Sequence, residues 1–327
     1  MKAKLFICVL FLLYSVQAAG QLQSANLSPE VATIVKAIAE YNKHEGPLIG
    51  KGAYKSDQWK RYQKLLRTAS IEELRKLTSD SNSVVRCYAF DGLLITHDTT
   101  VFSIAISHLH DTARISDLEG CIGGNWKVSE YMLVQTHRLG HNAKLDSAIL
   151  CDEKIELTVK DFIMTDLKPQ LKYYQEIRRF ALTGDDEIAL VALARYKNSN
   201  DTGILKTYLN KPNVGNYTIY AVREFPNAEF YPELVRFFKR EWPKGDYDNW
   251  KWRVLYQALA QYPTQQTLLL FKKTLPAKYE YDNKALAIDR VIALTRYPNP
   301  LFENVKNSIK LDEYAMNQVN ENMYSEK

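Results

Sequence analysis

The sequence predicts an all-α protein built as a solenoid, in which helical hairpins stack on one another. A helix stop made of an aromatic residue and a proline occurs at Tyr262–Pro263 and returns 35 residues later (262 to 297) at Tyr297–Pro298. An apolar stripe with helical spacing precedes the first stop and contains Val254, Leu255, Ala258, Leu259 and Tyr262. A single hairpin cannot bury such a stripe alone, so repeated hairpins of this kind stack.

The first 20 residues have the features of a secretory signal peptide. Lys2 and Lys4 form a positive start, Leu5–Tyr14 is apolar, and Val16–Ala18 offers small residues for cleavage. The apolar run is shorter than the roughly 20 residues that a bilayer-spanning helix needs. We therefore expect residues 1–20 to be removed and the mature protein to be periplasmic or extracellular. An uncleaved anchor helix is the alternative.

The composition is that of a globular protein, with 46% hydrophobic and 25% charged residues in a chain of 327. Loss of Lys2 and Lys4 with the signal peptide would lower the formal charge from +5 to +3. This charge is too small to indicate a nucleic-acid partner or an anionic membrane surface. No later stretch is long and apolar enough to cross a membrane, so we expect no transmembrane segment in the mature chain.

Three cysteines remain after the signal peptide, which is an odd number for an oxidising compartment. Cys87 lies on an apolar helix face, where it is expected to be buried. A Cys121–Cys151 disulfide is possible, but the sequence does not decide it.

Residues 21–69 are expected to form N-terminal capping helices. Leu27–Tyr41 reads as a helix that Ser28 caps, with Pro29 in its first turn. Ser56–Arg67 reads as a second helix, and the glycine- and proline-containing segment Gly46–Gly52 is interpreted as a linker between them.

The next segment contains two helices joined by a polar turn. Ile71, Leu74 and Leu77 mark the first helix, and the turn is Asp80–Ser83. The second helix then shows a Val-Arg pair, a small residue and a second small residue before leucine, at Val85, Arg86, Ala89, Gly92 and Leu93. Small residues allow close helix packing. The pattern resembles HEAT repeats and armadillo-like α-solenoids, and this resemblance implies a right-handed superhelix that serves as a binding surface.

We assign residues 70–311 to HEAT-like helical repeats, with an irregular insertion near 143–197 and a polar C-terminal tail at 312–327. Three later hairpins can be laid over one another, with second helices at Tyr217–Phe225, Trp250–Tyr262 and Lys284–Tyr297, each followed by proline. Asparagine stands at the expected start of each second helix and is interpreted as an N-cap: Asn125, Asn216, Asn249 and Asn283.

The loops that join the helices of a hairpin are the candidate binding surface, because stacking would place them on one edge. They mix aromatic residues with Asp and Asn, which suits contact with a peptide, protein or glycan. The candidate residues are Trp126, Trp242, Tyr247, Asp248, Trp250, Tyr279 and Tyr281. The alternative is that the aromatic rings only hold the loops onto the core.

Histidines are the candidates for a metal or catalytic site. His137 and His141 have the i, i+4 spacing of ligands on one helix face, and His97 is expected on the same edge. We treat this zinc site as a weak candidate beside surface histidines at helix ends. No catalytic motif is recognisable, so no catalytic residue and no cofactor are assigned.

The sequence therefore favours an exported, non-catalytic scaffold or adaptor that binds a protein or peptide. The alternative is an exported hydrolase or lyase that acts on an envelope or extracellular polymer. Its site would lie at the loops between helices or at the His97, His137 and His141 edge.

Overall fold

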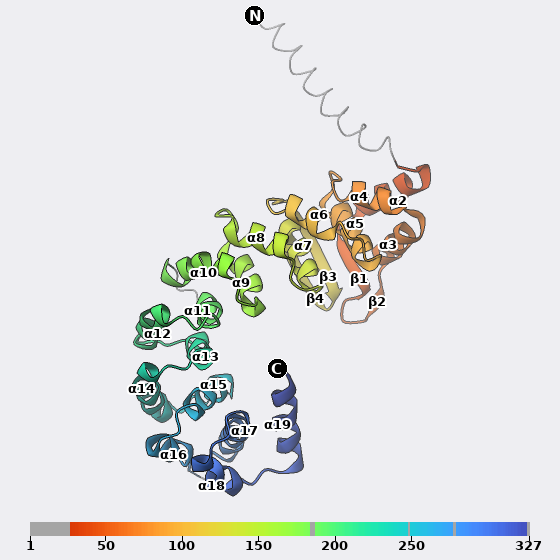
Figure 1. The fold of residues 1–327 in the computed structure, drawn as a ribbon. Coiled ribbons are helices and arrows are strands. Elements are labelled where there is room, and N and C mark those ends of the chain that lie inside the picture. Colours follow the sequence, from red (N-terminus) through yellow and green to blue (C-terminus); the bar gives the residue numbers. More distant parts are fainter. Residues whose placement is uncertain (1–26, 184–186, 248, 277–278, 326–327) are drawn as a thin grey trace, which may run out of the picture. The chain divides into compact units, whose positions relative to one another are not determined.

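The computed structural model describes residues 27–183, 187–247, 249–276 and 279–325 (Figure 1). The predicted signal peptide at 1–20 lies outside the described residues. The described chain is mostly helical and also contains one small sheet. It divides into two compact units, Met1–Ile163 and Met164–Lys327. No helix in the described ranges is long and apolar enough to span a bilayer.

The first unit is built around a central, buried helix. Its helices are α2 (Pro29–Tyr41), α3 (Asp57–Thr68), α4 (Ile71–Leu77), α5 (Ser83–Ile95), α6 (Val101–Ser107), α7 (Val128–His137) and α8 (Ala143–Cys151), while α9 (Leu157–Asp166) runs across the division. Helix α5 packs against α2, α4 and α7, and its residues from Val84 to Phe90 are all buried. It is therefore the core element of this unit.

In the α4–α5 hairpin, side chains cap the start of both helices. Ser70 and Glu73 form a capping box at the start of α4, and the Asn82 side chain caps α5. A Cβ atom added at Gly92 would lie 2.9 Å from the Leu66 side chain. The expected close packing at this small residue is therefore confirmed.

The first unit also contains a small four-stranded sheet, which the sequence analysis did not predict. Its strands are β1 (His44–Ile49), β2 (Tyr54–Lys55), β3 (Arg114–Gly120) and β4 (Ile122–Lys127), in the order β2-β1-β3-β4. Strands β1 and β3 are parallel, and the other two pairs are antiparallel. The register shifts between Glu45 and Ile49, where Pro47 cannot donate a ladder hydrogen bond.

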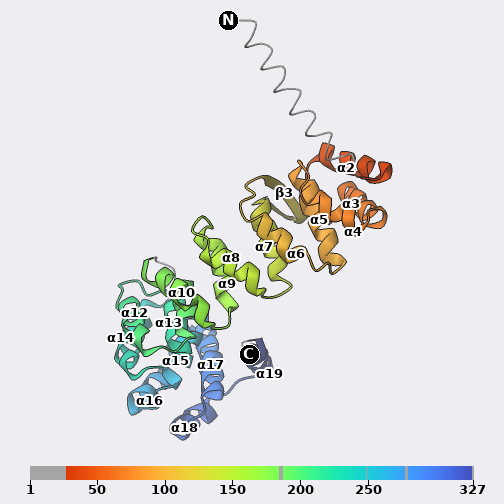
Figure 2. The same cartoon turned by 45° about the horizontal axis from the view of Figure 1, so that its top comes forward.

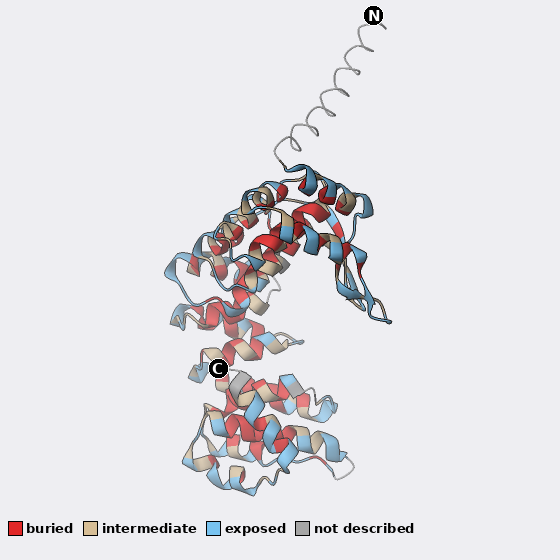
Figure 3. Cartoon of the chain, turned by 90° about the vertical axis from the view of Figure 1, so that its right-hand side faces the viewer, coloured by how far each residue is buried: buried red, intermediate tan, exposed pale blue. Residues whose placement is uncertain are grey.

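The segment 46–52, interpreted as a linker, thus begins within β1, and the segment 123–126, interpreted as a loop, lies within β4. Asn125 is a strand residue and not an N-cap. The sheet lies beside α5 and α7 (Figures 1 and 2), and Figure 3 shows exposed residues at the projecting end of the strands.

The regular secondary structure described in the second unit is entirely helical, and its odd-numbered helices from α11 to α19 pack against one another in chain order. The helices of this unit are α10 (Leu171–Thr183), α11 (Glu187–Ala194), α12 (Thr202–Leu209), α13 (Asn216–Glu224), α14 (Tyr231–Glu241), α15 (Asn249–Ala260), α16 (Gln265–Phe271), α17 (Glu280–Arg296), α18 (Pro300–Ser308) and α19 (Glu313–Ser325). Short 3₁₀ turns occur at Ser199–Asp201, Ala228–Phe230 and Trp242–Lys244. Contacts run from α11 to α13, α15, α17 and α19 in succession.

The aromatic–proline stops are confirmed at two helix ends, since Phe225 and Tyr297 are the C-caps of α13 and α17. Besides Asn125, the asparagine caps predicted at Asn216 and Asn283 are wrong. Asn216 is the first residue of α13, after Gly215 as N-cap. Asn283 lies inside α17, and its side chain bonds the backbone of Leu275 in the preceding segment.

Most of the polar C-terminal segment, predicted as a tail at 312–327, forms helix α19. Ala315 and Val319 are buried against Ile288, Val291 and Ile292 of α17. Helix α19 therefore covers an apolar face at the end of the second unit.

Candidate functional site

The aromatic residues predicted as one binding edge form two sets, one on each unit. Trp126 lies in β4 of the first unit, and the others lie in the second. Asp248 lies outside the described residues. The ring of Trp242 stacks on Phe238 with 5.2 Å between centroids, and the Tyr247 hydroxyl donates to the Trp242 carbonyl at 3.0 Å. Trp242 and Tyr247 thus hold their loop onto the core.

The remaining aromatic candidates of the second unit are more accessible. Trp250 is 37% exposed, with its ring 5.1 Å from that of Tyr217. Tyr279 and Tyr281 are 40% and 80% exposed. Tyr281 borders a small cavity that also contains Arg253. Their exposed rings offer contact area to a partner.

The three candidate metal histidines do not form a metal site. His137 and His141 do meet, with ring centroids 5.8 Å apart, and His141 Nδ1 lies 3.3 Å from Asp146 Oδ2. However, no three His, Cys, Asp or Glu side chains in the described part of the chain are placed to hold a metal ion. His97 follows α5 with a φ of 54° and joins no such group.

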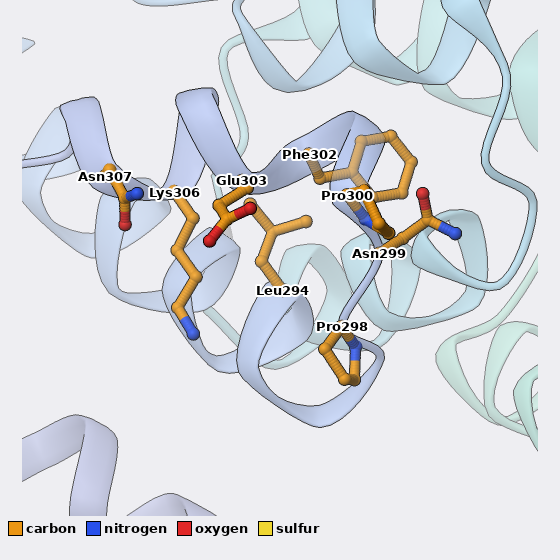
Figure 4. Close-up of a pocket in the computed structure, with 8 residues that line it drawn as sticks. All are labelled: Leu294, Pro298, Asn299, Pro300, Phe302, Glu303, Lys306 and Asn307. Atoms are coloured by element: carbon orange, nitrogen blue, oxygen red, sulfur yellow. The ribbon is translucent and has the colours of Figure 1, made fainter.

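A hollow of about 300 Å³ lies at the end of the second unit, where α17 meets α18 (Figure 4). Pro298, Pro300 and Phe302 give it an apolar wall, and Glu303 and Lys306 supply one charge of each sign. Nothing in its lining combines an acid, a base and a nucleophile. It is a weaker candidate than the site of the first unit.

The strongest candidate site surrounds His44, which the sequence analysis did not select. His44 is the first residue of β1 and its side chain is 8% exposed. Its Nδ1 donates to Asp117 Oδ1 at 2.8 Å, and its Nε2 donates to Asp91 Oδ2 at 3.1 Å. Burial alone lowers the pKa of His44, but the hydrogen bonds with Asp117 and Asp91 outweigh it and raise the pKa to about 9. The imidazole is therefore charged at neutral pH.

Aromatic residues fix the position of this imidazolium. Its ring stacks on Tyr88 of α5 at a centroid distance of 4.2 Å. The Tyr88 hydroxyl accepts from the Glu45 backbone N–H at 2.7 Å and donates to the Glu45 carbonyl at 3.0 Å. Tyr131 of α7 donates its hydroxyl to Asp91 Oδ2 at 2.8 Å, and burial raises the pKa of its phenol. Strand β1 is thus tied to both α5 and α7.

Two adjoining cavities form a groove over the face of the sheet beside α5 and α7. Their volumes are about 300 and 290 Å³. They share five lining residues: Asp117, Glu119, Tyr131, Gln135 and Arg138. The first cavity is also lined by Trp59 and Tyr62, and the second by Ile122 and Trp126. Throughout, we call this feature the sheet groove.

The sheet face explains why the groove exists. Asp117 pairs with His44 on one side and with Gly124 on the other, so these residues point to the same face. A Cβ atom at Gly46 would lie 3.2 Å from Glu119 Cγ, and one at Gly124 would lie 2.8 Å from Trp126 Nε1. Glycine at both positions leaves space in which the Glu119 and Trp126 side chains lie across the strands.

Two carboxylate groups of the groove retain binding capacity. The Glu119 side chain makes no hydrogen bond or ion pair with any residue that the structure describes. Asp117 uses Oδ1 for His44, and its Oδ2 has no partner in the same set of residues. Arg138 bonds Gln135 at 3.0 Å and neither of these acids. The groove therefore offers acceptor oxygens next to aromatic rings.

The lining limits the chemistry of the groove. It contains no serine, threonine or cysteine that could serve as a nucleophile. Both nitrogens of His44 are bound to carboxylates, so this histidine cannot accept a proton at neutral pH. The arrangement is better suited to binding than to proton abstraction by histidine.

Comparisons with known proteins add no assignment: no protein-family model, no curated protein and no solved structure matches the chain. The cysteines can be placed from the structure alone. Cys87 is free and buried, as expected, while Cys121 and Cys151 are free and exposed, so the possible disulfide between them is not formed.

Proposed function

We propose that this chain is an exported, non-catalytic binding module that holds a segment of a protein or peptide partner in the sheet groove. The observation that carries the proposal is the groove itself, in which two adjoining cavities share acidic and aromatic lining residues. Binding sites combine apolar and aromatic area with a few polar groups in this way. Export rests on the signal-peptide pattern of residues 1–20.

The second unit would serve as a scaffold in this proposal. The succession of packed helices from α11 to α19 supports an α-solenoid of the HEAT or armadillo-like kind. Such arrays present extended surfaces, and Trp250 and Tyr281 would add partner contacts there. Replacing Trp250 with alanine should weaken a partner that also uses this unit, with little effect on the melting temperature.

A blocking variant tests the role of the sheet groove. Gln135 lies on α7, is partly exposed and lines both cavities, so Gln135→Trp should fill the groove without disturbing the core. Gln63→Trp is a matched control, because Gln63 is exposed on α3 and does not line the groove. The assay selects peptides from a displayed random library and measures their affinity by calorimetry.

We expect peptides selected on the unaltered protein to lose at least about tenfold in affinity, or roughly 1.4 kcal/mol, to Gln135→Trp. The Gln63→Trp variant should bind them as before. Equal binding by the two variants would place the partner elsewhere, and a library that yields no binder would count against the proposal as a whole.

The second candidate function is that of a hydrolase or lyase acting on an extracellular polymer. The observation in its favour is that Asp91, Asp117 and the Tyr131 phenol meet at the groove, because carboxyl groups and tyrosine serve as general acids and bases. Incubation with polysaccharide and peptide polymers decides this. Product formation that Asp117→Asn abolishes would favour the enzyme over the binding module.

A further inference from the structure

The acidic part of the sheet groove indicates which chemical group a partner places there. Asp117 and Glu119 are two residues apart on β3 and point to the same face of the sheet. The Glu119 carboxylate has no partner among the described residues, and Asp117 keeps Oδ2 free while Oδ1 bonds His44. Carboxylate oxygens in this state bind strongly to donors that carry positive charge.

The charges of the lining agree with a cationic ligand. Asp91, Asp117 and Glu119 supply three negative charges, whereas His44 and Arg138 supply two positive ones. The His44 charge is already bonded to Asp91 and Asp117, and Arg138 bonds Gln135. The carboxylate that remains without a counter-charge is that of Glu119.

Aromatic rings at the same place favour a cation on an aliphatic stem. Trp59 and Tyr62 of α3 line the cavity that contains Glu119, and their ring centroids lie 5.0 Å apart. Trp126 lines the adjoining cavity. A lysine or arginine side chain can pack its methylene groups on the half-buried ring of Trp59 and gain a cation–π contact there.

The second cavity indicates that the cation belongs to a peptide and not to a small amine. It extends the groove along β4 and has apolar lining residues, Ile122, Trp126 and Val134, besides the shared acids. This space suits a side chain that neighbours the cationic residue on an extended segment. We propose that the sheet groove recognises a lysine or arginine side chain of an extended partner segment, which binds at Asp117 and Glu119. This inference rests on the proposed function.

His44 acts in this recognition as a positioning residue. It holds Asp117 through Oδ1 and leaves Oδ2 for the ligand. Its second hydrogen bond, to Asp91, reduces the freedom of the imidazolium to turn. A ligand cation therefore binds a carboxylate whose orientation is already fixed. This lowers the entropy cost of ordering the Asp117 side chain on binding.

The test uses the full chain and four short peptide libraries that differ only in a fixed central residue: lysine, arginine, norleucine or citrulline. Norleucine keeps the four-carbon stem of lysine without its ammonium group, and citrulline keeps the length of the arginine side chain without its charge. We expect the lysine and arginine libraries to yield binders at least about tenfold tighter than their uncharged counterparts. This preference should weaken as salt is added.

Glu119→Gln is the variant that tests the carboxylate, because the Glu119 side chain has no partner in the described fold whose loss could unfold the protein. We expect it to reduce the charge preference to less than about threefold. Arg114→Gln, on the same strand outside the groove, is the matched control and should leave the preference unchanged.

The outcomes separate this inference from the proposed function. Equal affinity for charged and uncharged libraries, with both lost in Gln135→Trp, would overturn cation recognition and leave groove binding intact. An unchanged charge preference in Glu119→Gln would also overturn the inference, because the cation would then be bound by other groups. Absence of binders from all four libraries would overturn both proposals.

Discussion

The charged state of His44 predicts how the stability of the first unit depends on pH. The pKa of His44 rises from 6.5 to about 9 on folding. Between these values the folded state keeps a proton that the unfolded state releases. The stabilisation is therefore complete below pH 6.5 and is lost as pH rises through 9.

The size of this effect follows from the shift in pKa. A change of one pKa unit corresponds to about 1.4 kcal/mol, so the His44 charge should contribute about 3 kcal/mol to folding below pH 6.5. The side chain is 8% exposed, so solvent screens the interaction little. This free energy is the net result of the attraction by Asp91 and Asp117 and the opposing cost of burying the charge.

The assay is denaturant unfolding at several pH values from 6 to 10, for the unaltered protein and for His44→Gln. The stability difference between the two should shrink by about 3 kcal/mol across this range. His97→Asn is the control, because His97 is exposed and asparagine tolerates its left-handed φ of 54°. Its unfolding profile should run parallel to that of the unaltered protein. If the His44→Gln profile is also parallel, the imidazolium is not the group that links stability to pH.

Three further predictions concern packing and accessibility. Gly92→Val should destabilise the first unit by about 1 to 3 kcal/mol, because a Cβ atom at position 92 would already lie 2.9 Å from the Leu66 side chain. Denaturant unfolding measures this, and an unchanged midpoint would refute the close packing. Tyr262→Phe should cost about 1 kcal/mol or more in the second unit, since the hydroxyl donates to the Asn227 carbonyl at 2.9 Å and accepts from its N–H at 3.0 Å. A thiol reagent should label Cys121 and Cys151 in the native protein, with Cys87 reacting only after unfolding; rapid labelling of all three would contradict the described burial.

The parts of the fold that depend on local chemistry could be predicted from the sequence. Phe225 and Tyr297 end helices because proline follows each of them, and proline restricts the residue before it. The Ser70–Glu73 capping box is likewise a property of neighbouring residues. Asn283 shows the limit of such reasoning, since its side chain bonds the Leu275 backbone across a turn and caps no helix.

The sheet and the candidate site could not be predicted in the same way. Strand β1 is short, contains glycine and proline, and finds its parallel partner in β3, far along the chain. His44 and Asp117 are 73 positions apart, so no local pattern connects them. A weaker signal did exist, because Asp91 is a carboxylate between the buried residues Phe90 and Leu93 of α5.

The parallel pairing of β1 with β3 also has a consequence for the order of folding. During synthesis β1 is made first, and about 70 further residues must be added before its partner strand β3 is present. The helix contacts of the second unit join near neighbours along the chain, and short-range contacts form quickly, whereas distant strand pairing is slow. In refolding experiments, the first unit should therefore reach its native structure later than the second unit, although it is translated earlier.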